Sequence, residues 1–170
     1  PAGRAARPGP RPGGAARLLV WVGARDLAMG GSTVSPTKGI EALFWNPAGV
    51  AKSDNSANIM FSHMSYIADI GVEYGAVSGA FGDLGTVALS IKSLSVGEIA
   101  VTTTENPDGT GQTYSPQFFT AGLTYSRMLS DRISVGLTAN LVTERISDVS
   151  ATGAAFNVGV IYDNLADLAG

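Results

Sequence analysis

The chain has 170 residues, of which 45% are hydrophobic and 15% are charged, and this balance excludes an intrinsically disordered protein. It contains no cysteine and one histidine, which excludes disulfide frameworks, thiolate chemistry and cysteine-bound metals. Four arginines precede Gly23, and from there on 7 basic and 14 acidic side chains give a net charge of −7, which disfavours nucleic acid as a partner.

Residues 1–22 form a leader rich in Arg, Pro, Gly and Ala, with no apolar periodicity. We interpret it as a disordered or artefactual extension. Its apolar stretch "LLVWV" is shorter than the core of a signal peptide, which has about 7 to 15 residues. An exported protein needs such a core, so we expect either that the leader was lost or that the chain is a fragment.

Residues 23–51 are dense in Gly and Ala and are expected to form a compact helical entry to the domain. The stretch "RDLAMGG" predicts a short helix closed by its final glycines. "SPTKGIEALFWNPAG" predicts a second helix with Ser35 as N-cap and Pro36 at its first position. Asn46-Pro47 then ends this helix, because the residue before a proline avoids the α region.

Residues 52–170 are predicted to be the strand-forming part of the chain. Six segments show the alternation of apolar and polar residues that is typical of β-strands, most clearly in the last three. Several segments have a length of about 9 to 11 residues, which a tilted strand needs to cross a bilayer. The predicted strands cover residues 57–66, 73–81, 85–93, 117–128, 132–143 and 153–163.

The two faces of the last three segments favour one architecture. Their polar faces carry Thr, Ser, Gly and Asn, whereas the water-facing side of a soluble sandwich collects Lys, Glu and Arg. Small residues suit a crowded or plugged lumen. Aromatic residues stand near strand ends on the apolar faces, as in the interfacial girdles of membrane barrels. The pattern favours an all-β, antiparallel up-and-down transmembrane β-barrel, with a soluble β-sandwich as the alternative. The aromatic residues are Phe119, Tyr125, Phe156 and Tyr162.

The predicted connections alternate in length. Residues 82–85 and 129–131 are expected to be tight turns, and residues 67–72, 94–116 and 144–152 are expected to be longer loops. Outer-membrane barrels have short turns at the periplasmic edge and longer loops outside the cell. Six strands cannot close such a barrel, for which about eight is the lower limit. We therefore expect the sequence to be the front part of a longer protein.

No catalytic pattern is found, and we expect a protein without enzymatic activity, cofactor or metal. The sequence has no phosphate-binding loop, no dinucleotide-binding glycine motif and no zinc-hydrolase histidine motif. His63 is interpreted as a packed or interface-facing residue, because a catalytic histidine needs an orienting partner. "ENPDGTGQT" lacks the spaced acidic ligands of a calcium loop and is interpreted as a turn. Glu98, Glu105 and Asp108 are expected to keep this connection solvated.

The segment "GARDLAMGG", followed by "ALFWNPAG" and a strand, resembles the N-terminal signature of the PorV/PorQ family of outer-membrane proteins, relatives of the FadL-type fatty-acid transporters. The continuation from "SYIADIGVEYG" to "NPDGTGQTYSP" is similar to that family's first strands and first long loop. The leader departs from the family, which has a signal peptide at that place. The resemblance implies a barrel with an N-terminal hatch folded into its lumen. The hatch signature that it implies consists of Gly23, Arg25, Met29, Gly30, Gly31, Trp45, Asn46, Pro47, Ala48 and Gly49.

Charged residues of a hatch inside a lumen need partners on the barrel wall. We expect them to form structural ion pairs there, with contact to a transported solute as the alternative. The charged residues are Arg25, Asp26, Lys38 and Glu41. Wall residues that can supply partners are Lys92, Asn140 and Asn157.

The resemblance also implies a function in the cell outer membrane, with outer-membrane lipid around the protein. A PorV-type protein works with the type IX secretion machinery: it receives secreted cargo proteins by their C-terminal signal domain and passes them to other secretion components. The alternative is FadL-like passive transport of hydrophobic molecules, in which the hatch shifts to open a route. A soluble all-β binding module is the third hypothesis.

Overall fold

The computed structural model describes most of the chain. The described residues are 22–23, 28–30, 37–65, 70–100, 104, 106, 110–146 and 149–163. The helix predicted over residues 25–31 lies largely outside them, as do Ser35 and Pro36.

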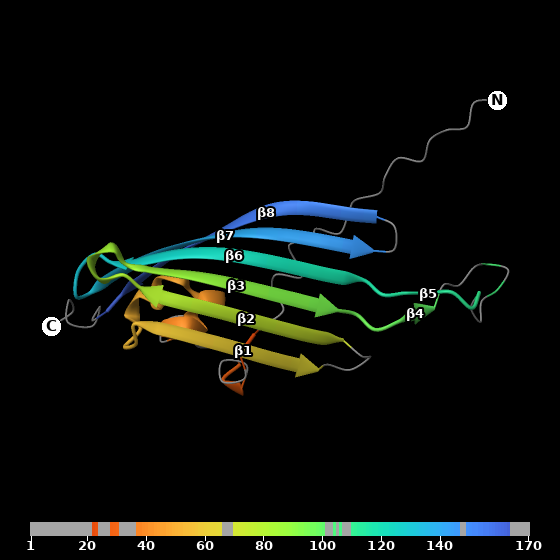
Figure 1. Ribbon diagram of the computed structural model, residues 1–170, viewed down its shortest axis with the longest axis horizontal. Coiled ribbons are helices and arrows are strands. Elements are labelled where there is room, and N and C mark those ends of the chain that lie inside the picture. Colours follow the sequence, from red (N-terminus) through yellow and green to blue (C-terminus); the bar gives the residue numbers. More distant parts are fainter. Residues whose placement is uncertain are drawn as a thin grey trace, which may run out of the picture.

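Six long strands form one antiparallel sheet, in the order β1-β2-β3-β6-β7-β8 (Figure 1). Within the described residues the sheet is not closed, and β1 and β8 are its edges. All six predicted strands are confirmed, with shifts of up to four residues at their ends. The strands are β1 (Ala57–Ser65), β2 (Gly71–Ala80), β3 (Thr86–Ser95), β6 (Gln117–Met128), β7 (Ile133–Ile146) and β8 (Val149–Tyr162).

Two predicted tight turns are confirmed, and both lie at the same end of the sheet, called the turn end below. Between β2 and β3, η4 (Gly82–Leu84) reverses the chain with positive φ angles at Gly82 and Gly85, which glycine adopts without strain. Between β6 and β7, the Leu129 amide donates a hydrogen bond to the Ile133 carbonyl at 2.8 Å.

The connections at the opposite end differ from the prediction in one case. The long connection between β3 and β6 is present and carries a small hairpin of β4 (Ile99–Ala100) and β5 (Thr113–Tyr114). The loop predicted over residues 144–152 is wrong, because the ladder continues until Ile146 pairs with Val149. The polar residues of "ERISDVSAT" indicated a loop, but cross-strand pairing with β6 and between β7 and β8 keeps most of them in the sheet.

A helical segment precedes the sheet and consists of η2 (Gly39–Glu41), α2 (Ala42–Trp45) and η3 (Pro47–Lys52). Asn46 ends α2 in an extended conformation, with φ −152° and ψ 107°, as expected before a proline. The same residue caps η3, since its Oδ1 accepts a hydrogen bond from the Ala48 amide at 3.1 Å. The chain therefore begins a new helical turn at Pro47, which was not predicted from the sequence.

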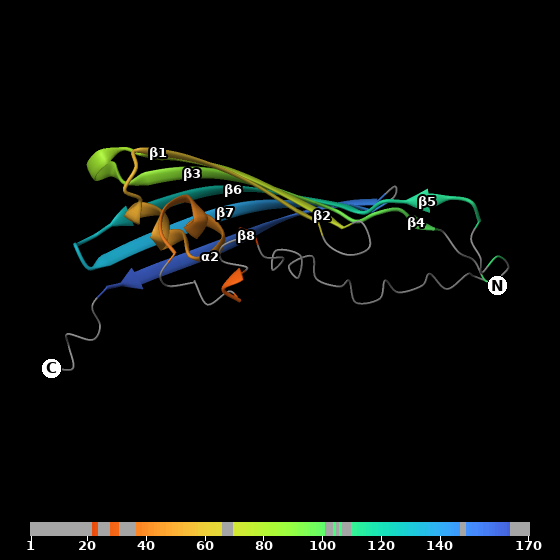
Figure 2. The same cartoon turned by 90° about the horizontal axis from the view of Figure 1, so that it is seen from below.

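The helical segment lies against one face of the curved sheet, near its turn end (Figure 2). This face is called the inner face, and the opposite face is called the outer face. On β6, β7 and β8 the inner face is the small polar face predicted from the alternation. Several hydroxyl side chains of the whole inner face are buried. They include Ser78, Thr86, Thr124, Ser126, Ser134 and Thr138.

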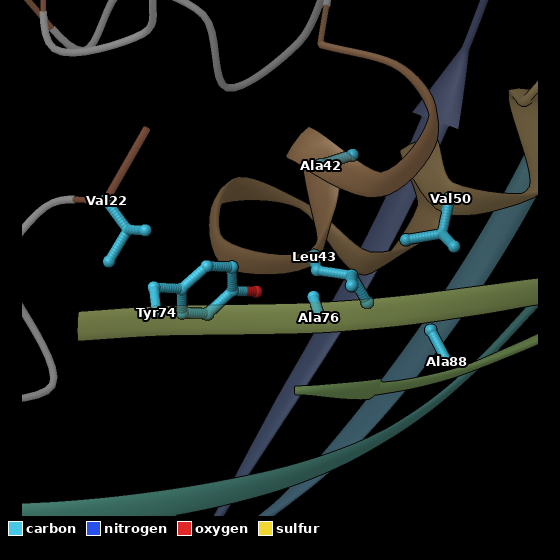
Figure 3. Packing of buried hydrophobic residues seen from close by; sticks show 7 residues of the cluster. All are labelled: Val22, Ala42, Leu43, Val50, Tyr74, Ala76 and Ala88. Carbon is cyan, nitrogen blue, oxygen red and sulfur yellow. The ribbon is translucent and has the colours of Figure 1, made fainter. Parts of the chain in front are cut away.

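The main apolar cluster lies between the helical segment and the first strands of the sheet (Figure 3). Side chains of α2 and η3 pack there against β2 and β3. Val22, which falls inside the predicted leader, belongs to the same cluster. A second, smaller cluster joins β2, β3 and β6 through Val72, Leu94 and Phe118. The main cluster consists of Val22, Ala42, Leu43, Val50, Tyr74, Ala76 and Ala88.

In the part of the chain that the structure describes, no helix combines the length and the apolar character needed to cross a membrane.

Candidate functional site at the helical segment

Two glycines of neighbouring strands form the floor on which the helical segment rests. Gly136 of β7 and Gly159 of β8 lie directly against Asn46, Pro47 and Ala48. A β-carbon at residue 136 would overlap the Pro47 carbonyl carbon. One at residue 159 would overlap Asn46 Oδ1 and lie 2.9 Å from Pro47 Cδ. A side chain at either position would therefore push the segment away from the sheet.

The hydroxyl of Ser126, on β6, joins η3 to the sheet by hydrogen bonds. It accepts one from the Ala51 amide at 3.2 Å and lies within donating distance of two carbonyl oxygens, those of Ala48 at 3.3 Å and Val135 at 3.1 Å. Ser126 is 0% exposed, so no water replaces these bonds. The sheet thus supplies a hydrogen-bond partner to two backbone groups of η3, the Ala51 amide and the Ala48 carbonyl.

Gly49 closes the segment on itself. A β-carbon at this position would overlap the Thr37 carbonyl oxygen and lie 2.7 Å from Ala42 Cβ. Ala42 and Ala48 are both fully buried. The contacts explain the "NPAG" sequence, because Asn46, Pro47 and Ala48 meet the wall and Gly49 meets the chain ahead of α2.

An ion pair connects the end of η3 with the residue that follows β8. Lys52 Nζ contacts Asp163 Oδ2. The Lys52 side chain is only 8% exposed, whereas the Asp163 side chain is 47% exposed. This ion pair differs from those predicted, because Lys52 lies just beyond the predicted hatch segment and Asp163 was not named as a partner.

A cavity of about 610 Å³ lies between the helical segment and the inner face. Phe44 and Trp45 of α2 line one side of the cavity. Their rings are arranged edge to face, with 5.2 Å between the ring centroids. Lys92 Nζ lies 5.0 Å from the centroid of the Phe44 ring, within the range of a cation–π interaction. The wall residues named from the sequence, Lys92, Asn140 and Asn157, all line this cavity.

The outer face carries large apolar side chains that no other described residue covers. On the two edge strands, Ile59 and Val158 are 85% and 76% exposed. An exposed apolar surface that extends over all six strands indicates contact with an apolar partner or a membrane. Its other members are Phe61, Val77, Val87, Leu89, Ile91, Phe119, Leu123, Tyr125, Leu137, Leu141, Phe156, Val160 and Tyr162.

Polar residues bound this apolar surface at the end opposite the turns. His63 of β1 and Glu73 of β2 are cross-strand partners on the outer face, and His63 Nδ1 contacts Glu73 Oε1. His63 therefore faces outward and is not packed in the core. Together with their cross-strand partners on the other strands, His63 and Glu73 form a row across the outer face. Only one member of this row is apolar. The row runs through His63, Glu73, Ser93, Phe119, Thr143 and Thr152.

Half of the predicted hatch signature comes together at the site. Trp45, Asn46, Pro47, Ala48 and Gly49 line the cavity, contact the wall or close the segment. Of the other half, Gly23 is buried with φ 92°, and Met29 and Gly30 are exposed. Arg25 and Gly31 lie outside the described residues, as does Asp26; Lys38 is exposed and Glu41 is partly buried.

Four residues that contact the helical segment were not identified from the sequence. The alternation places Gly136 and Gly159 on the polar face, but it gives no reason to separate them from the other glycines of that face. Ser126 is one of several hydroxyl residues there. Asp163 lies 111 positions from Lys52, so no local pattern connects the two.

Within the described ranges, no group of His, Asp and Glu side chains is arranged to hold a metal ion. Comparison with protein-family models, with curated proteins and with solved structures gives no match to this chain. The geometry of the two faces is therefore the basis for a functional proposal.

Proposed function

We propose that this chain forms part of the wall and the hatch of an outer-membrane β-barrel, with its outer face toward lipid and its inner face toward the lumen. The observation that carries the proposal is the chemistry of the two faces. Among the described residues nothing covers the apolar face, and the helical segment lies over the turn-end part of the small polar face. A soluble sheet covers its apolar face and exposes the polar one. The opposite arrangement is typical of a membrane barrel with a plugged lumen.

The strand lengths support the same proposal. They range from 9 residues in β1 to 14 in β7 and β8, and a tilted strand needs about 9 to 11 to cross a bilayer. The edges of β1 and β8 would leave backbone groups unpaired in lipid, which costs several kcal/mol for each group. The proposal therefore requires further strands that complete a barrel of at least about eight.

We propose that the protein with this architecture acts as a PorV-type shuttle in secretion and has no enzymatic activity. The proposal rests on the resemblance of the segments that contain "GARDLAMGG" and "ALFWNPAG". It is supported by the contacts of Asn46 to Lys52 with the wall, because a hatch held by close packing, hydrogen bonds and an ion pair is suited to remain in place. The partners are outer-membrane lipid, secreted cargo proteins and other secretion components, and no nucleic acid.

The cavity favours FadL-like passive transport of hydrophobic molecules as a second candidate. Its volume of about 610 Å³ is in the range of small-molecule pockets, and Phe44 and Trp45 give it an aromatic wall. Residues 43–47 line the cavity and also belong to the hatch. In this candidate function, a shift of these residues opens the route for the transported molecule.

Deletion of the full-length gene in its source organism separates the two candidates. The shuttle role predicts that secreted proteins with a common C-terminal domain disappear from the medium and accumulate in the periplasm, and that the intact gene restores them. An unchanged set of secreted proteins contradicts the shuttle role. Impaired growth of the same strain on long-chain fatty acids then supports transport.

A further inference from the structure

The turns at the turn end carry large apolar side chains. Leu84, in the turn after β2, is 73% exposed, and Leu129, in the turn after β6, is 62% exposed. The Phe81 ring lies over the outer face of Gly79, since a β-carbon there would be 3.6 Å from the ring. Turns that face water favour Gly, Pro, Asn, Asp and Ser. Contact with water therefore does not explain these three apolar residues.

Tyr125 and Arg127 connect these turns with the apolar outer face. Both are outer-face residues at the end of β6, and the Tyr125 hydroxyl donates a hydrogen bond to the Leu84 carbonyl oxygen at 2.7 Å. A β-carbon at Gly85 would lie 3.2 Å from Arg127 Cβ, so the turn reaches this residue as well. We call Phe81, Leu84, Tyr125, Arg127 and Leu129 the rim.

Without the turn residues Phe81, Leu84 and Leu129, the apolar surface is too short to match a bilayer. On β6 it extends from Phe119 to Tyr125, about 20 Å for six steps of roughly 3.3 Å each. A strand tilt of about 40° reduces this length to a height of about 15 Å, compared with about 25 Å for the apolar band of a membrane barrel. On β7, from Ile133 to Leu141, the same calculation gives a height of about 20 Å.

The opposite end of the sheet cannot supply the missing height. The row from His63 to Thr152 is already largely polar, and the next outer-face row contains no large apolar residue. That row runs through Ser65, Gly71, Ser95, Gln117, Arg145 and Ser150. The apolar residues that can extend the band are therefore those of the rim.

We propose that the rim is a lipid-anchoring surface that inserts into the phospholipid leaflet at the turn end. This inference rests on the proposed barrel and places Leu84 and Leu129 at the boundary between the acyl chains and the headgroups. The Tyr125 ring lies on the apolar side of this boundary, and its hydroxyl reaches the level of the Leu84 carbonyl, where an apolar ring with a polar hydroxyl is favoured. The Arg127 side chain runs along apolar surface and brings its guanidinium to the lipid phosphates.

The charges of the turns indicate the kind of lipid. Arg127 and Arg132 are exposed there together with Asp83 and Asp131, and Asp54, ahead of β1 at the same end, is also exposed. This set has no net positive charge, so it does not favour an anionic headgroup and fits a zwitterionic one, which itself carries a phosphate and an ammonium group. The partner is therefore a zwitterionic phospholipid such as phosphatidylethanolamine.

Spin labels measure the depth of the rim directly. Residues 1–170 contain no cysteine, so cysteines introduced among them give unique labelling sites once any cysteine in the further strands is replaced. Leu84→Cys and Leu129→Cys report on the rim, Leu137→Cys on the middle of the outer face, and Gln117→Cys on its polar end. Each full chain is labelled with a nitroxide in phosphatidylethanolamine/phosphatidylcholine vesicles. The rate at which the nitroxide collides with oxygen, which concentrates in lipid, is then compared with its rate of collision with a water-soluble nickel chelate.

We expect the ratio of oxygen to nickel collisions at residues 84 and 129 to be several-fold higher than at residue 117 and lower than at residue 137. The rim is overturned if the ratio is high at residue 137 but the ratios at residues 84 and 129 equal that at residue 117. This result does not contradict the proposed barrel. A water-like ratio at residue 137 overturns the proposed barrel, and the rim with it.

Discussion

Gly159 and Asn46 touch so closely that a β-carbon on the glycine would overlap the Oδ1 atom of the asparagine. That oxygen also accepts the hydrogen bond from the Ala48 amide, so the contact connects β8 with the N-cap of η3. Gly136 stands in the same relation to Pro47. The absence of a side chain at two positions of the sheet thus determines where the helical segment lies.

Gly159→Ala and Gly136→Ala are expected to displace η3 from the wall. Each should lower the free energy of unfolding by about 1 to 3 kcal/mol, the usual cost of an added methyl group in a packed site. The helical segment should also be cleaved faster in limited proteolysis. Gly153→Ala is the matched control, since Gly153 lies on the same strand and face with no atom within 4 Å of a β-carbon. An equal effect of all three changes contradicts the docking role of the two glycines.

Ser126 and Ser134 form a second matched pair, because both are 0% exposed on the inner face of neighbouring strands. Ser126→Ala removes the acceptor of the Ala51 amide, and a buried donor without a partner costs about 1 to 3 kcal/mol. Ser134 Oγ has no hydrogen-bond partner among the described residues, so Ser134→Ala should be neutral or slightly stabilising. Urea unfolding of both variants measures the difference. Similar losses for the two would show that the Ser126 bonds do not hold η3.

The Lys52–Asp163 ion pair should respond asymmetrically to the loss of each partner. Asp163→Asn leaves the nearly buried Lys52 ammonium without its carboxylate and should destabilise by about 1 to 3 kcal/mol. Lys52→Met leaves Asp163, which is about half exposed and can be solvated, and should cost less. A double-mutant cycle of unfolding free energies measures the coupling. A larger loss for Lys52→Met than for Asp163→Asn would be inconsistent with this geometry.

The sheet could be predicted from the sequence because its alternation is local. Each later strand places small polar and large apolar residues on opposite faces, and this pattern also gave the composition of the covered face. The predicted ends of the strands were less accurate. Glu144 and Arg145 read as the start of a loop, but pairing with Phe118 and Gln117 of β6 keeps them in β7. Cross-strand pairing is not visible in a single strand.

The site could be predicted in part. "WNPAG" was identified, and the Asn cap with Pro at the next position is a helix-start signal that could also have located η3. Its partners on the wall could not be found in this way. Gly136, Gly159 and Ser126 differ from similar residues on the same face only in what lies above them, and this depends on how the complete chain packs.

The most direct measurement of the central claim, that the outer face meets lipid, compares Leu137→Arg with Thr143→Arg. Both residues lie on the outer face of β7, Leu137 in the apolar band and Thr143 in the polar row. Urea titration of the folded protein in phospholipid vesicles gives the folding free energy of each variant. The barrel predicts a loss of about 2 to 4 kcal/mol for Leu137→Arg and of about 0 to 1 kcal/mol for Thr143→Arg. Small and equal losses for both variants would contradict it.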